Sequence, residues 1–554
     1  MRIVILHKKV YEFLKKSGID CDYDEDTDEI KICITIENIN FKLLMKFPHY
    51  YPYEFPEIYI DDTKGLIIPH MYTNNRLCLY DINEVLPNPQ HFLEDALDSV
   101  MRAKRLLIDS KKGENIIDYQ IENVSFWEAK ATGRVDYLGD RNLTTHILWR
   151  YEWLEEYNIV ADDREKIAEF ITNSYGIKPE EIIYDRALFI NIGEKVLINL
   201  KKIADIQELI PKSDLSIFYG FLCKNSGKGL IILYADNGNG KCLLSLEIGL
   251  SSYGVKLSRR NIKGILAANK GKTFKKFITR NYQMKRLFTR GGDGNVSFDK
   301  RCLLMGCGSI GSYVSKAIID IGITDNITLL DKDLLEVENL ARHLCGSDYL
   351  CLPTSKSEAL KSELLKHYPA MKCKAIVENA WEFFLNRCTE LNSFDLILIC
   401  VGNTLIEKKV IQLLKEKQIK KECIILWVEP YLVAGHALVF RGEIDPSTEK
   451  HIFDINGRFN NNVLIESKKY LKSEAGCQSA YAPYAGFEAQ KFVLDFLDVY
   501  YRKIYTKKEK HNYEFTWIGK MKWARQQKFE IKAQWRSKED RFMELKRIDN
   551  QCII

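Results

Sequence analysis

A glycine-rich turn between two apolar runs constrains this chain more than any other feature. Residues 302–305 form a short apolar run that leads directly into the turn, which has the spacing G-x-G-x-x-G. Its glycines are Gly306, Gly308 and Gly311. Apolar residues at helical spacing follow, and a second apolar run at residues 327–330 ends on Asp331. This order predicts a strand, a tight turn, a helix and a parallel strand. Glycines let the backbone approach phosphate oxygens at the helix N-terminus, so the pattern predicts a nucleotide site.

The residues that follow this strand–turn–helix–strand unit indicate which kind of reaction the predicted nucleotide site supports. D-K-D at residues 331–333 is followed by E-N-L-A-R at residues 338–342 and then by Lys356. This order resembles the ThiF/ubiquitin-activating family, whose signature is D-x-D, then N-L-x-R, then a lysine. The resemblance implies that the chain uses ATP to adenylate the C-terminal carboxylate of a small protein. A dehydrogenase would use the glycine turn for NAD, but hydride transfer has no evident use for two cations beside it.

The resemblance also implies a role for the polar residues of this motif. Asp331 would accept hydrogen bonds from the ribose hydroxyls, and Arg342 and Lys356 would bring positive charge to the triphosphate. Mg²⁺ is the implied metal, but Gly402 stands where the family usually has its Mg²⁺-holding Asp. Asp333 or the bound phosphates are the alternatives for holding it. The predicted nucleotide-binding residues are Gly306, Gly308, Gly311, Asp331, Asp333, Asn339, Arg342 and Lys356.

Lys356 is expected to begin a helix. Ser355 and Glu358 have the spacing of a capping box, in which each side chain satisfies a free backbone N–H group at the helix start. Pro369 requires this helix to end before it.

Cys477 lies in the sequence S-E-A-G-C-Q-S-A-Y-A-P-Y. Glycine and alanine neighbours leave a sulfur accessible, unlike the Leu and Ile neighbours of a core cysteine. In bacterial relatives of the activating family, a G-C-x-[ST] segment here holds the cysteine that takes the acyl group from the adenylate. Cys477 is therefore predicted to be catalytic. Glu429 and His436 stand alone in the sequence and are assigned no role.

The first 125 residues suggest a helix, a meander of strands and a further helix. Residues 30–36 and 41–47 have the alternation of strands, and a proline-rich aromatic loop follows them. The later residues Tyr51, Pro52, Pro56, His70 and Cys78 resemble the ubiquitin-conjugating-enzyme fold. The resemblance implies that Cys78 carries an acyl group as a thioester and passes it to an amine.

One departure from the conjugating pattern concerns the residue that stabilises the oxyanion. The family's His-Pro-Asn is His70-Met71-Tyr72 here, so the usual Asn is absent from its place. Asn74 and Asn75 are the candidates to replace it, and the alternative is that Cys78 is one more buried thiol.

The chain is expected to be an α/β multidomain protein. We predict an N-terminal ubiquitin-conjugating-like α+β domain over residues 1–125 and a mixed α/β linker domain over residues 126–285. A C-terminal Rossmann-like ThiF/activating-type adenylation domain, with its catalytic-cysteine segment, is predicted over residues 286–554. The linker carries no motif to which chemistry can be attached.

Composition limits the other possibilities. The fifteen cysteines contain no C-x-x-C pair, so a four-cysteine zinc site has no support. A net charge of +5 over 554 residues does not argue for a nucleic-acid partner. No run of eighteen apolar residues occurs, which predicts a cytoplasmic chain with no membrane partner.

The two cysteine-bearing segments together resemble the fused activating–conjugating enzymes of bacterial CBASS anti-phage systems. This resemblance implies a relay in which Cys477 captures the adenylated protein, Cys78 receives it, and an amine accepts it. It also implies a homodimer and, as the carried protein, a cGAS-like nucleotidyltransferase (CD-NTase). Two alternatives remain, namely an enzyme that activates a sulfur carrier, and a non-catalytic assembly protein that binds a nucleotide.

Overall fold

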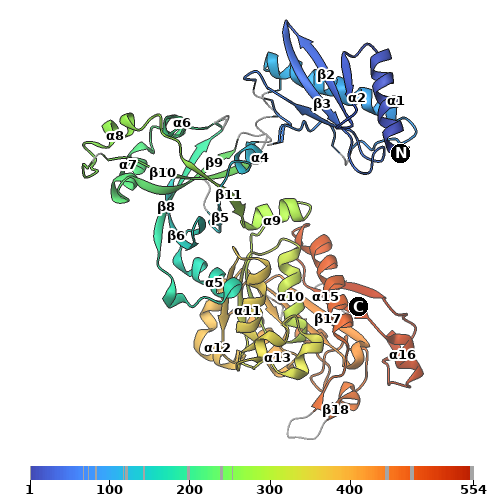
Figure 1. Cartoon of the computed structure of the whole chain (residues 1–554). Helices are drawn as coiled ribbons and strands as arrows, with labels where there is room; N and C mark the ends of the chain where they lie inside the picture. The colour runs from blue at the N-terminus through green and yellow to red at the C-terminus, as the bar shows by residue number, and fades with distance from the viewer. Residues whose placement is uncertain are drawn as a thin grey trace. The chain divides into compact units, whose positions relative to one another are not determined.

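The computed structural model describes residues 2–66, 68–72, 74–81, 84–115, 118, 123–140, 144–195, 200–236, 241–252, 254–442, 444, 448–473 and 480–548. The chain divides into two compact units (Figure 1). One comprises Met1–Ile167 and Ile183–Asn281, and the other comprises Ala168–Ile182 and Tyr282–Ile554. Within the described ranges, no helix is both long and apolar enough to cross a membrane.

The N-terminal part is an antiparallel meander in the order β1-β2-β3-β4, with two helices packed on it. Its elements are α1 (Arg2–Lys16), β1 (Cys21–Asp24), β2 (Glu29–Ile36), β3 (Ile39–Lys46), β4 (Glu57–Ile60) and α2 (Phe92–Lys112). Along β2, every second residue from Ile30 to Ile36 is buried, because successive side chains of a strand point to opposite faces. Val10 and Leu14 from α1 and Val100 from α2 complete this core. The predicted strands at residues 30–36 and 41–47 are confirmed.

The middle of the chain is built around a closed barrel in the order β10-β11-β5-β7-β6-β8-β9. Its strands are β5 (Gly133–Tyr137), β6 (His146–Leu154), β7 (Tyr157–Ala161), β8 (Asp185–Gly193), β9 (Lys228–Asp236), β10 (Lys241–Gly249) and β11 (Lys275–Asn281). The helical elements in this region are α4 (Asn123–Glu128), α5 (Arg164–Tyr175), η1 (Pro179–Glu181), α6 (Ile203–Leu209), α7 (Leu215–Lys224) and α8 (Ile262–Ala268). Apolar residues of α6, α7 and α8 pack against one set of barrel side chains.

The second unit is organised by a mixed sheet in the order β14-β13-β12-β15-β16-β17-β20-β21. The strands β14, β13, β12, β15 and β16 run parallel, and β17, β20 and β21 add antiparallel pairs. The strands are β12 (Arg301–Met305), β13 (Asn326–Leu330), β14 (Lys372–Ile376), β15 (Leu396–Ile399), β16 (Glu422–Val428), β17 (Ala434–Phe440), β20 (Tyr513–Ile518) and β21 (Met543–Arg547). A short pair, β18 (Lys472–Ser473) and β19 (Ala480–Tyr481), lies apart from this sheet.

Helices cover both faces of this sheet. On β12, Cys302 and Leu304 enter one core with α10, α11 and α15, while Leu303 and Met305 enter the other with α12 and α13. Helices α10 and α15 lie side by side (Figure 1). The helical elements of this unit are α9 (Met284–Gly291), α10 (Ser309–Asp320), η2 (Val337–Arg342), η3 (Ser347–Leu350), α11 (Lys356–His367), α12 (Ala380–Arg387), η4 (Cys388–Ser393), α13 (Thr404–Lys415), η5 (Pro430–Leu432), α14 (Thr448–Ile452), η6 (Ser467–Tyr470), α15 (Gly486–Tyr500), the π-helical turn η7 (Tyr501–Tyr505), α16 (Met521–Gln526) and η8 (Ala533–Trp535). Strands buried on both faces are typical of parallel sheets in α/β proteins.

The strand order reverses direction at β12. The chain moves from β12 to β13 and β14 on one side, and then crosses to β15 and β16 on the other side. The loops that leave β12 and β15 therefore separate, which opens a crevice at the carboxyl ends of these two strands. The first of these loops contains the predicted glycine turn.

Candidate nucleotide-binding site

The glycine turn requires glycine at two of its three positions. Gly306 has a φ of +89°, and a Cβ there would lie 2.7 Å from the backbone of Cys400. A Cβ on Gly311 would overlap the carbonyl oxygen of Gly306, so glycine lets α10 pack directly on the loop. A Cβ on Gly308 would meet no heavy atom within 4 Å. A side chain therefore has no room at Gly306 or Gly311, whereas space is free beside Gly308.

A cavity of about 350 Å³ lies at the carboxyl ends of β12, β13 and β15. It brings together most of the residues that the sequence predicted for a nucleotide. These residues are Gly306, Gly308, Asp331, Asp333 and Lys356. Such a position, where the strand order of a parallel sheet reverses, is where open α/β sheets bind their ligands.

Asp331 is held in the cavity by the backbone. Its Oδ2 accepts the N–H of Cys307 at 2.7 Å, and its Oδ1 accepts the N–H of Asp333 at 2.9 Å. Burial raises the pKa of Asp331, although these two hydrogen bonds oppose the shift. Each carboxylate oxygen has a second lone pair, so Asp331 can still accept hydrogen bonds from a ligand hydroxyl.

Lys356 begins α11 beside Asp331, as predicted. The Ser355 hydroxyl accepts the Glu358 N–H at 3.2 Å, so Ser355 caps the helix as predicted. The Glu358 carboxylate accepts the Ser355 hydroxyl at 3.0 Å in place of the Ser355 backbone N–H, so only one half of the predicted capping box forms. The Nζ of Lys356 lies 3.5 Å from Oδ2 of Asp333, and the Lys356 side chain is only 15% exposed. A cation and a helix N-terminus therefore face the same cavity, which favours an anionic ligand.

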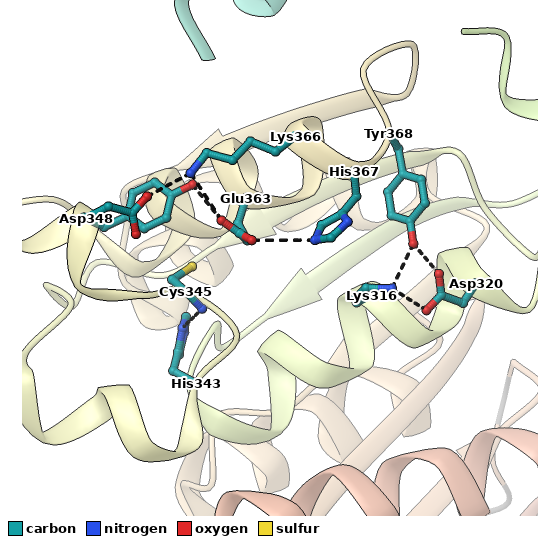
Figure 2. A network of polar contacts seen from close by, with 10 residues as sticks. Lys316, Asp320, His343, Cys345, Asp348, Glu363, Lys366, His367 and Tyr368 are labelled. Atoms are coloured by element: carbon teal, nitrogen blue, oxygen red, sulfur yellow. Dashed lines mark hydrogen bonds and ion pairs between the residues drawn. The ribbon is translucent and has the colours of Figure 1, made fainter. Parts of the chain in front are cut away.

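Polar contacts hold α11 against its neighbours at the end remote from Lys356. Figure 2 shows Tyr368 donating to Asp320 on α10, and Lys316 donating to the Tyr368 hydroxyl at 3.1 Å. On the other side, Nζ of Lys366 donates to Asp348 in η3 at 2.8 Å (Figure 2). These contacts restrain the helix that carries Lys356.

Gly311, Asn339 and Arg342 lie outside the cavity lining. Gly311 acts through packing, and Asn339 accepts the N–H of Glu336 at 3.0 Å within η2. Arg342 donates to the carbonyl oxygen of Ala482 at 3.1 Å, with its guanidinium 5.0 Å from the Tyr484 ring. In this arrangement the charge of Arg342 faces the segment before α15, and a contact between Arg342 and a triphosphate remains a prediction.

The donor set of the cavity fits Mg²⁺ only with help from a ligand. Among the described residues, no three His, Cys, Asp or Glu side chains are grouped so that they could hold a metal. Mg²⁺ commonly binds one or two carboxylates together with substrate phosphates and water. Asp333, whose side chain is 60% exposed at the cavity, is suited to that arrangement. Gly402, at φ +60°, lies between the lining residues Val401 and Asn403 and has no side chain that could serve as a ligand.

The sequence interpretation missed the cavity wall formed by α12. Asn379 and Trp381 line the cavity at the start of this helix. The Asn379 side chain caps α12 by accepting the Trp381 N–H at 2.9 Å, and Glu382 completes a capping box. The N-x-x-E spacing directly after a parallel strand was the signal, because carboxyl ends of neighbouring parallel strands meet at one edge of the sheet.

The first of the predicted catalytic cysteines, Cys78, lies near a tyrosine that the sequence did not indicate. Its N–H donates to the His70 carbonyl oxygen at 2.5 Å, so the predicted His70 segment is adjacent. The Tyr72 hydroxyl donates to the Cys78 sulfur over 3.7 Å, and the Arg76 guanidinium lies 4.3 Å from the Tyr72 ring. This hydrogen bond, together with burial, raises the pKa of Tyr72.

Neither candidate asparagine is placed at Cys78 in this structure. Asn74 accepts the N–H of Arg76 at 3.2 Å, and Asn75 adopts a left-handed turn with φ +66°. Both line a different cavity, over the face of the β1–β4 sheet. The polar groups recorded beside the sulfur of Cys78 are the Tyr72 hydroxyl, which donates to it, and the Tyr80 carbonyl oxygen, which accepts from it at 4.0 Å. Cys477 lies outside the described residues.

Glu429 and His436, which stand alone in the sequence, form a buried pair. The Nε2 of His436 lies 2.8 Å from Oε1 of Glu429, and both side chains are at most 2% exposed. Glu429 also accepts the N–H groups of Val463 and Leu464 at 2.6 and 2.9 Å. The two residues are thus neighbours in the fold although seven positions separate them, and Glu429 anchors the chain segment at residues 463–464.

Residues 280–472 match the ThiF family model. The second unit contains a ThiF-family domain. The matched range includes the glycine turn and every residue lining the cavity. The predicted resemblance to this family is confirmed for this part of the chain.

Curated relatives of this chain include two proteins named "ATP-dependent ubiquitin transferase-like protein Cap2". The one from Enterobacter hormaechei subsp. hoffmannii (strain UCI 50) is 30% identical over 130 residues, which cover 23% of this chain and 20% of the relative. The one from Pseudomonas aeruginosa (strain BWHPSA011 / Pa011) is 24% identical over 188 residues, 33% of this chain and 32% of the relative. The matches thus span about a fifth and a third of these relatives' length.

Solved structures similar to the chain include E. coli MccB. The structure of MccB with AMPCPP and SeMet MccA is 19% identical, covers 44% of this chain and 59% of MccB, and has a TM-score of 0.22. The structure of MccB with succinimide is 16% identical, covers 62% of this chain and 81% of MccB, and has a TM-score of 0.29.

Proposed function

We propose that this protein uses ATP to adenylate the C-terminal carboxylate of a protein substrate. The supporting observation is the convergence of Gly308, Asp331 and Lys356 on one cavity within the ThiF-matching segment. The names of the Cap2 relatives, which call them ATP-dependent and ubiquitin transferase-like, agree with this chemistry.

In this proposal the residues of the cavity bind ATP and stabilise charge. Asp331 accepts the ribose hydroxyls, and the open side of Gly308 receives the phosphates at the start of α10. The substrate carboxylate attacks the α-phosphorus, the bond to the β-phosphate oxygen breaks, and pyrophosphate leaves. Lys356 stabilises the negative charge that builds on the phosphates. Asp333 would hold Mg²⁺ together with the phosphates, and the ion would supply further charge neutralisation there.

After adenylation, two cysteines relay the acyl group. The Cys477 thiolate attacks the acyl adenylate, forms a thioester and releases AMP. The Cys78 thiolate takes over the acyl group by thioester exchange, and an amine then forms an amide and frees Cys78. The Tyr72 hydroxyl is placed to donate a hydrogen bond to the oxyanion that forms at Cys78, since it already reaches the sulfur.

We further propose that the carried protein is a CD-NTase of a CBASS anti-phage system and that the acceptor is a lysine or another amine. A homodimer and a cytoplasmic location, without nucleic-acid or membrane partners, complete the proposal. Its support is the Cap2 name of the relatives together with the order of Cys78, the ThiF-matching segment and Cys477 in the chain.

A gel experiment tests this relay. The protein is mixed with Mg-ATP and the candidate CD-NTase, and reductant-sensitive adducts are sought on non-reducing gels. Loss of all adducts in Cys477→Ala, with Cys78→Ala blocking only transfer to the final amine, would support the relay. Cys351→Ala, which removes an exposed cysteine outside the proposed relay, is the matched control. Adducts that survive both catalytic substitutions would refute the order of transfer.

A further inference from the structure

His343 lies buried behind the glycine turn and contacts it directly. The residue follows η2 and is only 6% exposed. Its Nε2 lies 2.7 Å from the carbonyl oxygen of Cys307, between Gly306 and Gly308. Its Nδ1 lies 3.0 Å from the backbone nitrogen of Cys345, and Figure 2 shows the ring directed at this nitrogen.

These two contacts determine which ring nitrogen carries the proton. The backbone N–H of Cys345 can only donate, so Nδ1 of His343 must accept with its lone pair. A neutral imidazole with an unprotonated Nδ1 carries its proton on Nε2, and Nε2 therefore donates to the Cys307 carbonyl oxygen. Burial, and to a smaller extent the charge of Lys356, lower the pKa of His343 and so favour this neutral form.

The Cys307 backbone is thus held at both of its polar groups. Its N–H donates to Asp331 at 2.7 Å, and its carbonyl oxygen accepts from His343. The peptide bond between Cys307 and Gly308 is trans, so the Gly308 N–H points away from that carbonyl oxygen and hence away from His343. Gly308 lines the cavity, and among the described residues no acceptor is paired with its N–H.

We infer that His343 is a positioning residue that orients the Cys307–Gly308 peptide so that the Gly308 N–H faces a phosphate oxygen of the nucleotide. The inference rests on the proposed ATP site and adds a residue to it. Without the His343 donor, the Cys307 carbonyl oxygen loses a buried hydrogen bond, and the peptide is free to rotate its N–H away from the ligand.

Two variants separate this role from simple packing. His343→Phe fills the space but has no donor, whereas His343→Gln keeps an amide that can donate to the Cys307 carbonyl oxygen. Binding of ATP and of adenosine is measured by calorimetry, and folding by the melting temperature. We expect His343→Phe to bind ATP about tenfold more weakly than the wild type. This factor corresponds to the free energy of about one hydrogen bond, here the bond from the Gly308 N–H to the phosphate. We expect His343→Gln to bind ATP within about twofold of the wild type and adenosine binding to be unchanged in both.

The ring nitrogen shifts of ¹⁵N-histidine-labelled wild type provide a test that needs no variant. A protonated Nε2 and an unprotonated Nδ1 on His343 are expected. The reverse tautomer would overturn the inference, as would equal ATP affinities for His343→Phe and the wild type. Equal losses of ATP and adenosine binding in both variants would also overturn it. If the wild type bound no ATP at all, the proposed function would fail first, and this inference would fail with it.

Discussion

The backbone N–H of Lys356 donates to the carbonyl oxygen of Asp333 at 2.8 Å, while the Lys356 Nζ lies 3.5 Å from the carboxylate of the same residue. Main chain and side chain together join the N-terminus of α11 to the loop after β13. The cation and the carboxylate that the proposal assigns to phosphates and Mg²⁺ are therefore neighbours before any ligand arrives. This arrangement makes Lys356 the most direct target for testing the site.

Lys356→Met should reduce the rate of adenylation on the order of 100-fold, because it removes a fixed positive charge from the place where phosphate charge develops. The measurement is ATP–pyrophosphate exchange with a saturating protein substrate. Lys361→Met removes a charge from the same helix, where Lys361 contacts Glu169 instead of the cavity, and should leave exchange unchanged. Equal losses in the two variants would show that the charge of α11, and not the position of Lys356, matters.

Gly308→Ala and Gly311→Ala should fail in different ways. A Cβ on Gly308 has open space, so this variant should keep the wild-type melting temperature but bind ATP less tightly, because the methyl group projects toward the ligand. A Cβ on Gly311 overlaps the Gly306 carbonyl oxygen, so this variant should melt at a lower temperature. Thermal melting with and without ATP distinguishes the two. Undiminished ATP binding by Gly308→Ala would place the phosphates elsewhere.

Glu407→Gln should stabilise the second unit at pH 8 more than at pH 5.5. Burial raises the pKa of Glu407 to about 8, and its Oε1 has no hydrogen-bond partner among the described residues. The folded state therefore keeps a proton that the unfolded state releases above about pH 4.3, so wild-type stability falls as the pH rises between these values. Glutamine cannot ionise, so the variant does not lose this part of its stability as the pH rises. Melting temperatures at the two pH values test it, and a variant effect independent of pH would contradict the assignment.

Tyr72→Phe should slow transfer of the acyl group from Cys78 to an amine about tenfold, because it removes the hydroxyl that reaches the sulfur. The ring that contacts Arg76 is retained, so folding should be unaffected. Single-turnover discharge of the Cys78 thioester measures the effect. Tyr53→Phe alters a tyrosine that is 74% exposed and serves as the control. Faster or unchanged discharge would exclude Tyr72 from the reaction.

The β12–α10–β13 unit could be predicted because its signals are local. The glycine spacing, the apolar runs and the N-cap at Ser355 each depend on a few consecutive residues, and the structure contains all of them. The barrel could not be predicted in the same way. Its strand β5 pairs in parallel with β11, and residues Gly133 and Phe277 of this pair are far apart in the sequence. Such pairing leaves no short-range pattern.

The candidate site was predictable in its residue types but not in its contacts. The sequence pointed to Asn74 and Asn75 near Cys78, yet the left-handed turn at Asn75 is part of a segment that lies over the sheet face. The hydroxyl that donates to the sulfur belongs to Tyr72. Similarly, His343 contacts Cys307 only because η2 brings the chain back behind the glycine turn. Backbone paths of this kind are set by tertiary packing and not by residue spacing.

ATP–pyrophosphate exchange measures adenylation of the protein substrate before any cysteine takes part, so it isolates the proposed reaction of the nucleotide site. The candidate CD-NTase is supplied either with a free C-terminal carboxylate or with an amidated C-terminus, which cannot be adenylated. We predict exchange with the free form for both the wild type and Cys477→Ala, no exchange with the amidated form, and exchange reduced on the order of 100-fold for Lys356→Met. Exchange that does not depend on the free carboxylate, or no exchange with any protein substrate tried, would contradict it.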